Sequence, residues 1–161
     1  MAEENWIVGI AEHKVTRNPN KLMAYGLGSC VGVVLYDPGT KVGGLAHVML
    51  PSSLFYSQPI LPGKFADTAI DTLISEMRKM ECRQENLISK IIGGANMFSS
   101  ISQNSIPIGL RNVAAVHEKL KSEGIPILAE QVGGTRGRTI IFDLASGRVE
   151  IRKLNQLSEW V

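Results

Sequence analysis

The chain has 161 residues, of which 44% are hydrophobic and 20% are charged, and its formal net charge is +2. This length and composition predict one globular domain over residues 1–161 with a sizeable core. A charge so close to neutral gives no basis for nucleic-acid binding. No stretch reaches the roughly 20 apolar residues that a membrane span needs. Residues 1–5 carry two acidic side chains and no apolar core follows them, so we expect no signal peptide and a cytoplasmic protein.

The first thirty residues predict strands separated by turns. Apolar and β-branched runs bounded by Pro, Asn and Gly are typical of strands. In chain order we expect a strand at residues 6–11, a short continuation at 14–17 and an extended segment at 21–25. The last of these leads into a glycine-rich loop that ends at Cys30.

A β-hairpin is predicted next, because apolar runs at 31–36 and 42–50 flank a Pro-Gly turn. If the turn centres on Pro38-Gly39, facing residue numbers sum to 77, and Cys30 faces His47 with Cβ atoms roughly 4.5–5.5 Å apart. A four-residue loop at 38–41 makes the sum 79 and the pair diagonal, roughly 7–8 Å apart. A three-residue loop places the two side chains on opposite faces. Pro38 disfavours the shortest loop, since a two-residue hairpin turn prefers positive φ at its first position.

A cysteine beside a histidine is a candidate nucleophile, since the imidazole accepts the thiol proton. We therefore predict Cys30 as nucleophile and His47 as base. The N–H groups of Gly28, Ser29 and Cys30 could converge on an oxyanion, which is a common device in acyl transfer. A buried structural cysteine beside a core histidine remains the alternative.

The rest of the chain alternates helices and strands. We expect an amphipathic helix at 63–80, a strand at 87–92, a Ser-rich loop at 99–107, a helix at 109–123 ended by Gly124, a strand at 125–132 and a second hairpin at 138–144 and 148–153, with no pattern in 154–161. The fold class is thus α/β, with two long helices and roughly seven to nine strands in mixed or antiparallel sheets.

The remaining cysteine and histidines predict neither a disulfide framework nor a metal site. Two distant cysteines favour a reducing compartment, and Cys82 is expected to be a partly exposed structural residue. The three histidines show no metal-ligand spacing, and we expect His13 and His117 to be surface residues. No cofactor is predicted.

Five ordered motifs and a sixth segment resemble the CheD family, the chemoreceptor glutamine deamidases of bacterial chemotaxis. They are Gly-Leu-Gly-Ser-Cys-Val at 26–31, Gly-Gly-Leu-Ala-His-Val-Met-Leu-Pro at 43–51, Gly-Lys-Phe-Ala-Asp-Thr-Ala at 63–69, Lys-Ile-Ile-Gly-Gly-Ala-Asn-Met-Phe at 90–98, Ile-Gly-Leu-Arg-Asn at 108–112 and the segment 129–138. The resemblance covers about residues 7–153 and leaves 154–161 as a tail.

The resemblance implies a layered α/β sandwich related to the cysteine hydrolases of deamidating toxins. It implies hydrolysis of receptor glutamines to glutamate with Cys30 as nucleophile and His47 as base, and a CheC-type phosphatase as partner. The family usually places a Thr six residues before the Cys, where this chain has Ala24. A backbone carbonyl, a water or the Ser29 hydroxyl then remains to orient the imidazole, or activity is reduced.

Two functions of different classes stay open. The first is a cysteine amidohydrolase that acts on protein glutamine. The second, favoured by Ala24, is a regulator that binds receptor and phosphatase with little or no turnover. A thiol redox sensor is disfavoured because no resolving cysteine lies near Cys30 in sequence. Phe98, at the mouth of the Ser-rich loop, is predicted to anchor a protein partner, and the alternative is a core side chain at the end of a strand.

Overall fold

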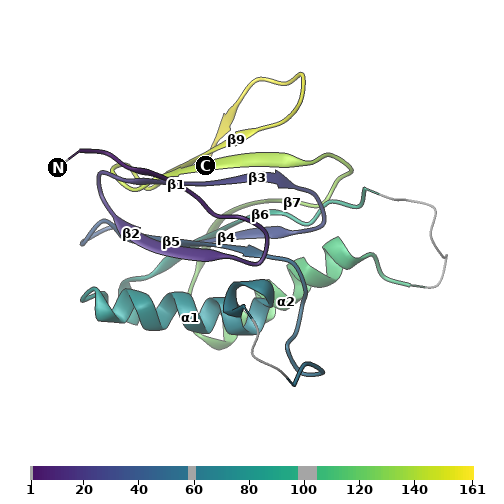
Figure 1. Ribbon diagram of the computed structural model, residues 1–161, viewed down its shortest axis with the longest axis horizontal. Helices are drawn as coiled ribbons and strands as arrows, with labels where there is room; N and C mark the ends of the chain where they lie inside the picture. Colours follow the sequence, from purple (N-terminus) through teal and green to yellow (C-terminus); the bar gives the residue numbers. More distant parts are fainter. Residues whose placement is uncertain (1, 58–60, 98–104) are drawn as a thin grey trace.

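The computed structural model describes residues 2–57, 61–97 and 105–161. These residues form three layers, with an upper sheet, a lower sheet and a pair of helices beneath it (Figure 1). The predicted α/β class is confirmed, and both sheets are mixed, since each contains one parallel pair. No helix of the described residues is long and apolar enough to cross a membrane.

The upper sheet has the strand order β1-β3-β8-β9-β10. Its strands are β1 (Asn5–Ile7), β3 (Lys21–Leu27), β8 (Arg138–Asp143), β9 (Arg148–Arg152) and β10 (Glu159–Trp160). The second predicted hairpin is therefore β8 and β9. The C-terminal tail, in which the sequence showed no pattern, adds β10 at the edge of this sheet.

The lower sheet has the order β2-β5-β4-β6-β7. Its strands are β2 (His13–Arg17), β4 (Val31–Asp37), β5 (Val42–Val48), β6 (Ile88–Gly93) and β7 (Ile127–Val132). The total of ten named strands exceeds the seven to nine predicted, because the short edge strands β1, β2 and β10 each pair separately.

Two helices cover the outer face of the lower sheet (Figure 1). They are α1 (Ala66–Lys79) and α2 (Ile108–Ser122), accompanied by the short 3₁₀ turns η1 (Pro62–Lys64) and η2 (Gln84–Asn86). The apolar side chains of α1 recur every three or four residues and are buried against the sheet. The helix starts three residues later than predicted, because η1 precedes it. Gly124 follows the end of α2 with φ of 69°, as the C-terminal signal predicts.

The strand β4 separates two hydrophobic clusters, since its successive side chains point to opposite faces. Val31, Val33 and Leu35 pack against the helices. Val34 and Tyr36 pack against the upper sheet, in the cluster that also contains Cys30. The inter-sheet layer is therefore the place where the candidate nucleophile lies.

The predicted strand at 6–11 is wrong beyond Ile7. The chain instead crosses from the upper sheet to the lower one over residues 8–12, and β2 then pairs with β5. The crossing contains a turn in which the Glu12 N–H donates to the Gly9 carbonyl at 3.0 Å, and Ala11 has φ of 68°. The crossing segment, residues 8–12, brings the N-terminal part of the chain against the end of β5.

The hairpin of β4 and β5 has the four-residue loop. Asp37 pairs with Val42, so facing residue numbers sum to 79, and the register of 77 is wrong. The Asp37 carboxylate accepts hydrogen bonds from the N–H groups of Gly39 at 2.9 Å and Thr40 at 3.4 Å. These bonds stabilise the longer loop, in which Pro38 avoids the positive φ that it cannot adopt.

Candidate active site

Cys30 and His47 meet at the end of the hairpin, where β4 begins and β5 ends (at right in Figure 1). His47 faces Gly32, so Cys30, two residues earlier, is its diagonal neighbour. Residue 32 is a glycine and places no side chain between them. Cys30 packs in the inter-sheet cluster, on the same side as His47. The diagonal arrangement is therefore the one that the chain adopts, with the two side chains on one face.

His47 is held from both sides by the crossing segment. Its main-chain N–H donates to the Glu12 carbonyl at 2.9 Å, and its carbonyl accepts from the Ala11 N–H at 3.0 Å. Its Nδ1 lies 3.2 Å from the Val8 carbonyl. Because a carbonyl only accepts, Nδ1 carries the proton of that bond. In the neutral ring, Nε2 is then the acceptor.

The acceptor nitrogen of His47 is available for a thiol proton. Nε2 is buried and has no hydrogen-bond partner among the described residues, and the whole side chain is only 1% exposed. The prediction that the pair lies near the surface therefore fits the half-buried Cys30 better than His47. An unpaired buried acceptor costs free energy, which is a common cost at sites that perform chemistry.

Burial acts on both members of the pair. It raises the pKa of the Cys30 thiol. It also lowers the pKa of His47, against the smaller opposing effects of the Val8 carbonyl and the Glu12 carboxylate. Both changes favour the neutral thiol and the neutral imidazole over the ion pair. In this resting form, His47 can act as a general base as soon as the sulfur attacks.

The loop that carries Cys30 is anchored through its carbonyls. Those of Gly28 and Cys30 accept hydrogen bonds from the N–H groups of Ala95 at 2.8 Å and Gly94 at 2.9 Å. The Ser29 carbonyl accepts from the side chain of Asn112 at 3.0 Å. The N–H groups of residues 28–30 make no hydrogen bond to the described residues. Three fixed carbonyls thus leave three neighbouring donors for an oxyanion.

The glycine at position 93 allows this anchoring. Gly93 has φ of 116°, and a Cβ built on it would lie 2.3 Å from the Cys30 carbonyl oxygen. Any other residue would therefore force the β6 end away from the nucleophile loop. Arg138 holds the same turn, since its guanidinium donates to the carbonyls of Gly93 at 3.0 Å and Gly133 at 2.7 Å.

Ala24 lies in β3, fully buried in the inter-sheet cluster, and offers no hydrogen-bonding side chain. Of the three groups left open by the sequence, a backbone carbonyl contacts the imidazole, and it belongs to Val8. Sequence reasoning missed Val8, because an apolar residue in a predicted strand gives no sign that its carbonyl meets a side chain. The main-chain N–H of Val8 donates to the carbonyl of Met23, next to Ala24, at 2.7 Å.

Other predicted residues lie away from the pair. Cys82 is buried, not partly exposed, and is 3.5 Å from the Thr40 hydroxyl. His13 is not a simple surface residue, since its Nε2 lies 2.9 Å from Glu76 of α1. His117 is exposed and contacts Glu130 at 2.8 Å. Phe98 falls outside the described residues. Among these, no group of three potential metal ligands occurs.

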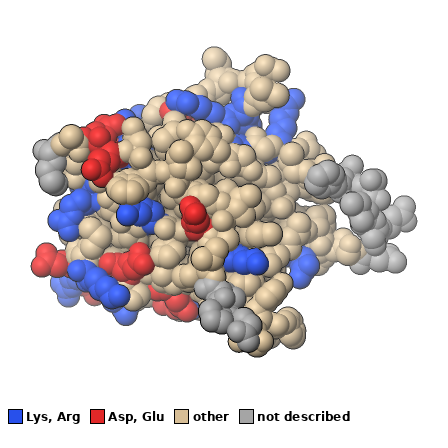
Figure 2. Space-filling model, viewed as in Figure 1, with Lys and Arg blue, Asp and Glu red and all other residues tan. Residues whose placement is uncertain are grey.

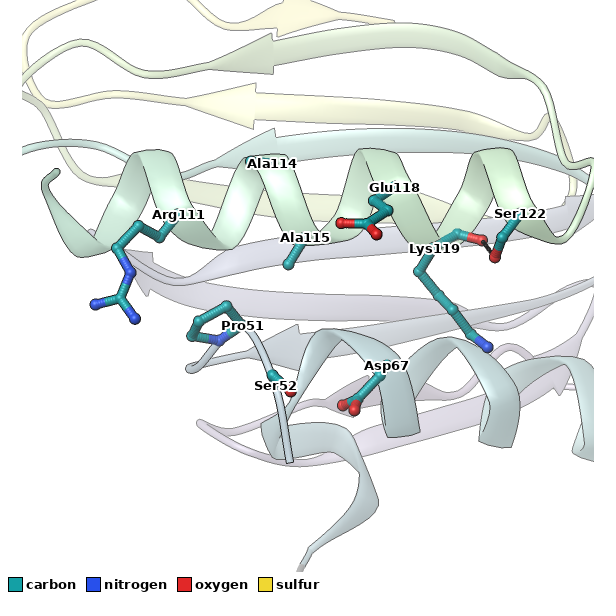
Figure 3. A pocket seen from close by; sticks show the side chains of 9 residues that line it. All are labelled: Pro51, Ser52, Asp67, Arg111, Ala114, Ala115, Glu118, Lys119 and Ser122. Atoms are coloured by element: carbon teal, nitrogen blue, oxygen red, sulfur yellow. Dashed lines mark hydrogen bonds between the residues drawn. The ribbon is translucent and has the colours of Figure 1, made fainter. Parts of the chain in front are cut away.

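A groove between α1 and α2 is separate from the Cys30–His47 pair (Figure 3). It is lined by Pro51, Ser52, Asp67, Arg111, Ala114, Ala115, Glu118, Lys119 and Ser122. The groove belongs to the helix layer, whereas the pair faces the upper sheet on the other side of the lower one. Lys119 bridges the helices by contacting Asp71 at 2.7 Å.

The surface near the pair is apolar and not acidic. Figure 2 shows acidic side chains over the left and centre of this face, whereas basic and uncharged ones cover the part where β3 ends and β4 begins. A Cβ at Gly28 would lie 3.4 Å from the Met97 side chain, so this exposed methionine borders the nucleophile loop. Further exposed apolar side chains occur on the segments after β5 and before α2, namely Leu54, Phe55, Tyr56, Leu61, Ile106 and Leu110.

Comparison with known proteins identifies relatives of this chain. A family model described as CheD chemotactic sensory transduction matches residues 49–153. A protein of Desulforamulus reducens named probable chemoreceptor glutamine deamidase CheD is 52% identical over 148 residues, which cover 91% of this chain and 89% of that protein. A protein of the same name from Clostridium botulinum strain Hall is 49% identical over 146 residues, 90% of each chain. The chain therefore belongs to the CheD family.

Proposed function

We propose that this protein hydrolyses the side-chain amide of selected glutamines on chemoreceptors to glutamate, with Cys30 as nucleophile and His47 as base. The substrate class follows from the relatives, which are named probable chemoreceptor glutamine deamidases. The free thiol suits a reducing cytoplasm, where we place the reaction. The relation of the fold to the deamidating toxins stays a prediction of the resemblance.

The orientation of the His47 ring carries the proposal. Its Nδ1–H is bound to the Val8 carbonyl, and Nε2 is left as a buried acceptor without a described partner. The neighbouring side chain on the same face is the Cys30 thiol. A structural histidine in a core would normally have both ring nitrogens satisfied. A base that awaits a proton has one nitrogen fixed and the other free.

The reaction begins when the sulfur of Cys30 attacks the amide carbon and the thiol proton moves to Nε2 of His47. The carbonyl oxygen of the substrate becomes negatively charged, and the N–H groups of residues 28–30 stabilise it. When the C–N bond breaks, Nε2 returns the proton to the leaving nitrogen, which departs as ammonia.

A thioester between Cys30 and the former glutamine side chain remains. Water attacks its carbonyl carbon while Nε2 of His47 accepts a proton from that water. Cleavage of the C–S bond then releases glutamate, and the proton on Nε2 restores the Cys30 thiol. The Val8 carbonyl keeps the ring in one tautomer throughout, as a carboxylate does in other triads.

Exposed apolar side chains around the nucleophile loop support a protein as the substrate. Phe55 is 90% exposed and Leu54 77%, and Met97 borders Gly28. Apolar side chains grouped on a surface commonly mark a protein contact. We propose that these segments contact the receptor around the reactive glutamine.

Ammonia release from a purified receptor signalling fragment tests the function, with mass spectrometry of its peptides to locate each conversion of glutamine to glutamate. The wild-type protein should release ammonia in proportion to the converted glutamines. The Cys30→Ala variant should release none. Equal ammonia release by the wild type and Cys30→Ala would refute the Cys30 mechanism.

The second candidate is a regulator that binds the receptor and a CheC-type phosphatase without turnover. Ala24 favours it, since no side chain at this position can bond to the imidazole. Under this reading Phe98 anchors the partner. The same receptor fragment separates the two functions, because the regulator would bind it and leave every glutamine unchanged.

A further inference from the structure

We propose that Asn112 of α2 is a positioning residue that sets the separation between the nucleophile loop and the strand of the base. The inference rests on the proposed function for its meaning in catalysis, but on the contacts of this chain for its geometry. Its side chain is fully buried, and its Nδ2 donates to the carbonyls of both Ser29 and Met49 at 3.0 Å. Ser29 precedes Cys30, and Met49 lies two residues after His47.

The contact occurs where the hairpin loses its own hydrogen bonds. The last paired residues of β4 and β5 are Val31 and Val48. Beyond them the two chains diverge, since the N–H groups of Met49 and Leu50 both donate to the Lys64 carbonyl at 2.9 Å. The amide of Asn112 therefore joins the two segments at the point where the sheet no longer does. Its loss would leave both carbonyls without this donor and both segments freer to move apart.

The position of α2 is itself fixed against the nucleophile loop. A Cβ built on Gly109 would lie 2.5 Å from the Ala95 carbonyl oxygen and 2.6 Å from that of Gly94. The helix thus packs directly on the two residues whose N–H groups bind Gly28 and Cys30. Three residues later on the same helix, Asn112 lies on a neighbouring position of that face and reaches the loop.

Packing alone does not explain an asparagine here. The Oδ1 atom of Asn112 is buried without a hydrogen-bond partner among the described residues. A buried acceptor without a partner destabilises the fold, and an apolar side chain of similar size would avoid that cost. The two bonds of Nδ2 are what an asparagine adds, and both end on segments that carry the reacting groups.

The test compares Asn112→Leu and the milder Asn112→Ala with the wild type, using Ser89→Ala as the matched control. Ser89 is also fully buried and donates to a backbone carbonyl, that of Pro126 at 2.8 Å, at the other end of β6. Each variant is measured well below its own midpoint of thermal unfolding. We expect the Asn112 variants to lose about 10- to 100-fold in kcat with KM changed less than about threefold, because misplacement affects alignment. Ser89→Ala should lose stability but keep kcat.

Alkylation of Cys30 by iodoacetamide supplies a readout that needs no substrate. In the Asn112 variants its rate at neutral pH should fall toward that of His47→Ala, because the thiol is further from its base. A rate equal to or above the wild type would overturn the proposal, as would a kcat retained by both Asn112 variants. If the wild type itself releases no ammonia, the proposed function fails, and the alkylation rates still decide the role of Asn112.

Discussion

Cys30 and Cys82 lie on opposite sides of the lower sheet, and their surroundings differ in one respect that matters for chemistry. Burial raises the pKa of both thiols. Cys82 packs in the cluster beneath the helices, where the Thr40 hydroxyl is 3.5 Å away. Cys30 packs between the sheets, next to a histidine whose Nε2 has no described partner.

The difference teaches that burial does not by itself distinguish a reactive cysteine from a structural one. Desolvation makes each thiol harder to ionise. Only Cys30 has a neighbour that can take its proton during the reaction, and only its loop presents free N–H groups to a developing oxyanion. The comparison predicts that substitutions in the two regions have opposite consequences for activity and stability.

The largest effect is expected from the cysteines themselves. Cys30→Ala should lower deamidation at least about 1,000-fold and leave the midpoint of thermal unfolding near that of the wild type, since the nucleophile is lost from a half-buried site. Cys82→Ala should keep kcat and lose about 1 kcal/mol of stability, because its site is buried. Ammonia release and thermal melts of the two variants measure both. The comparison would be wrong if Cys82→Ala lost activity and Cys30→Ala retained it.

Removal of the base should rank next. His47→Ala is expected to lower kcat about 100- to 10,000-fold, the range for a general acid–base residue. His117→Ala is the matched control, because that imidazole is exposed and contacts only Glu130 among the described acidic residues. It should leave kcat unchanged. Activity of His47→Ala close to that of the wild type would assign the imidazole a structural role.

Much of the hairpin and helices could be predicted from the sequence. Apolar periodicity located α1 and α2 to within a few residues, and the Asp-Pro-Gly-Thr segment located the turn. The register could not be chosen by the same means, because it depends on how the Asp37 side chain bonds the loop N–H groups. The sequence offered the correct register as one of three alternatives.

The supporting atoms of the site were beyond sequence reasoning. Val8 acts through its carbonyl, and main-chain atoms are the same at every position of a chain. Asn112 is distant in sequence from both Cys30 and His47, and only the packing of α2 on residues 94–95 brings it to them. Residue types predicted the reacting groups, whereas tertiary structure determines what orients them.

A smaller effect concerns pH. Burial lowers the pKa of His47, so the neutral base persists to lower pH than an exposed histidine allows. The acidic limb of kcat/KM should therefore lie below pH 6.5, the ordinary value for histidine. As pH falls through this limb, Nε2 becomes protonated and activity is lost. A limb above that value would indicate that a Cys30 thiolate stabilises the charged imidazole.

The smallest effect is expected from Ala24→Thr. The family usually has a Thr here, and a strand accepts this residue readily. Since the Val8 carbonyl already binds Nδ1 at 3.2 Å, an added hydroxyl should change kcat by less than about threefold. Ala24→Val is the matched control, because it adds the same bulk to a fully buried position without a hydroxyl. A rise of about tenfold in Ala24→Thr, absent from Ala24→Val, would mean that a carbonyl orients His47 less well than a side chain does. That result would leave Cys30 distinguished from Cys82 by its base, but with a base that this chain holds below its best alignment.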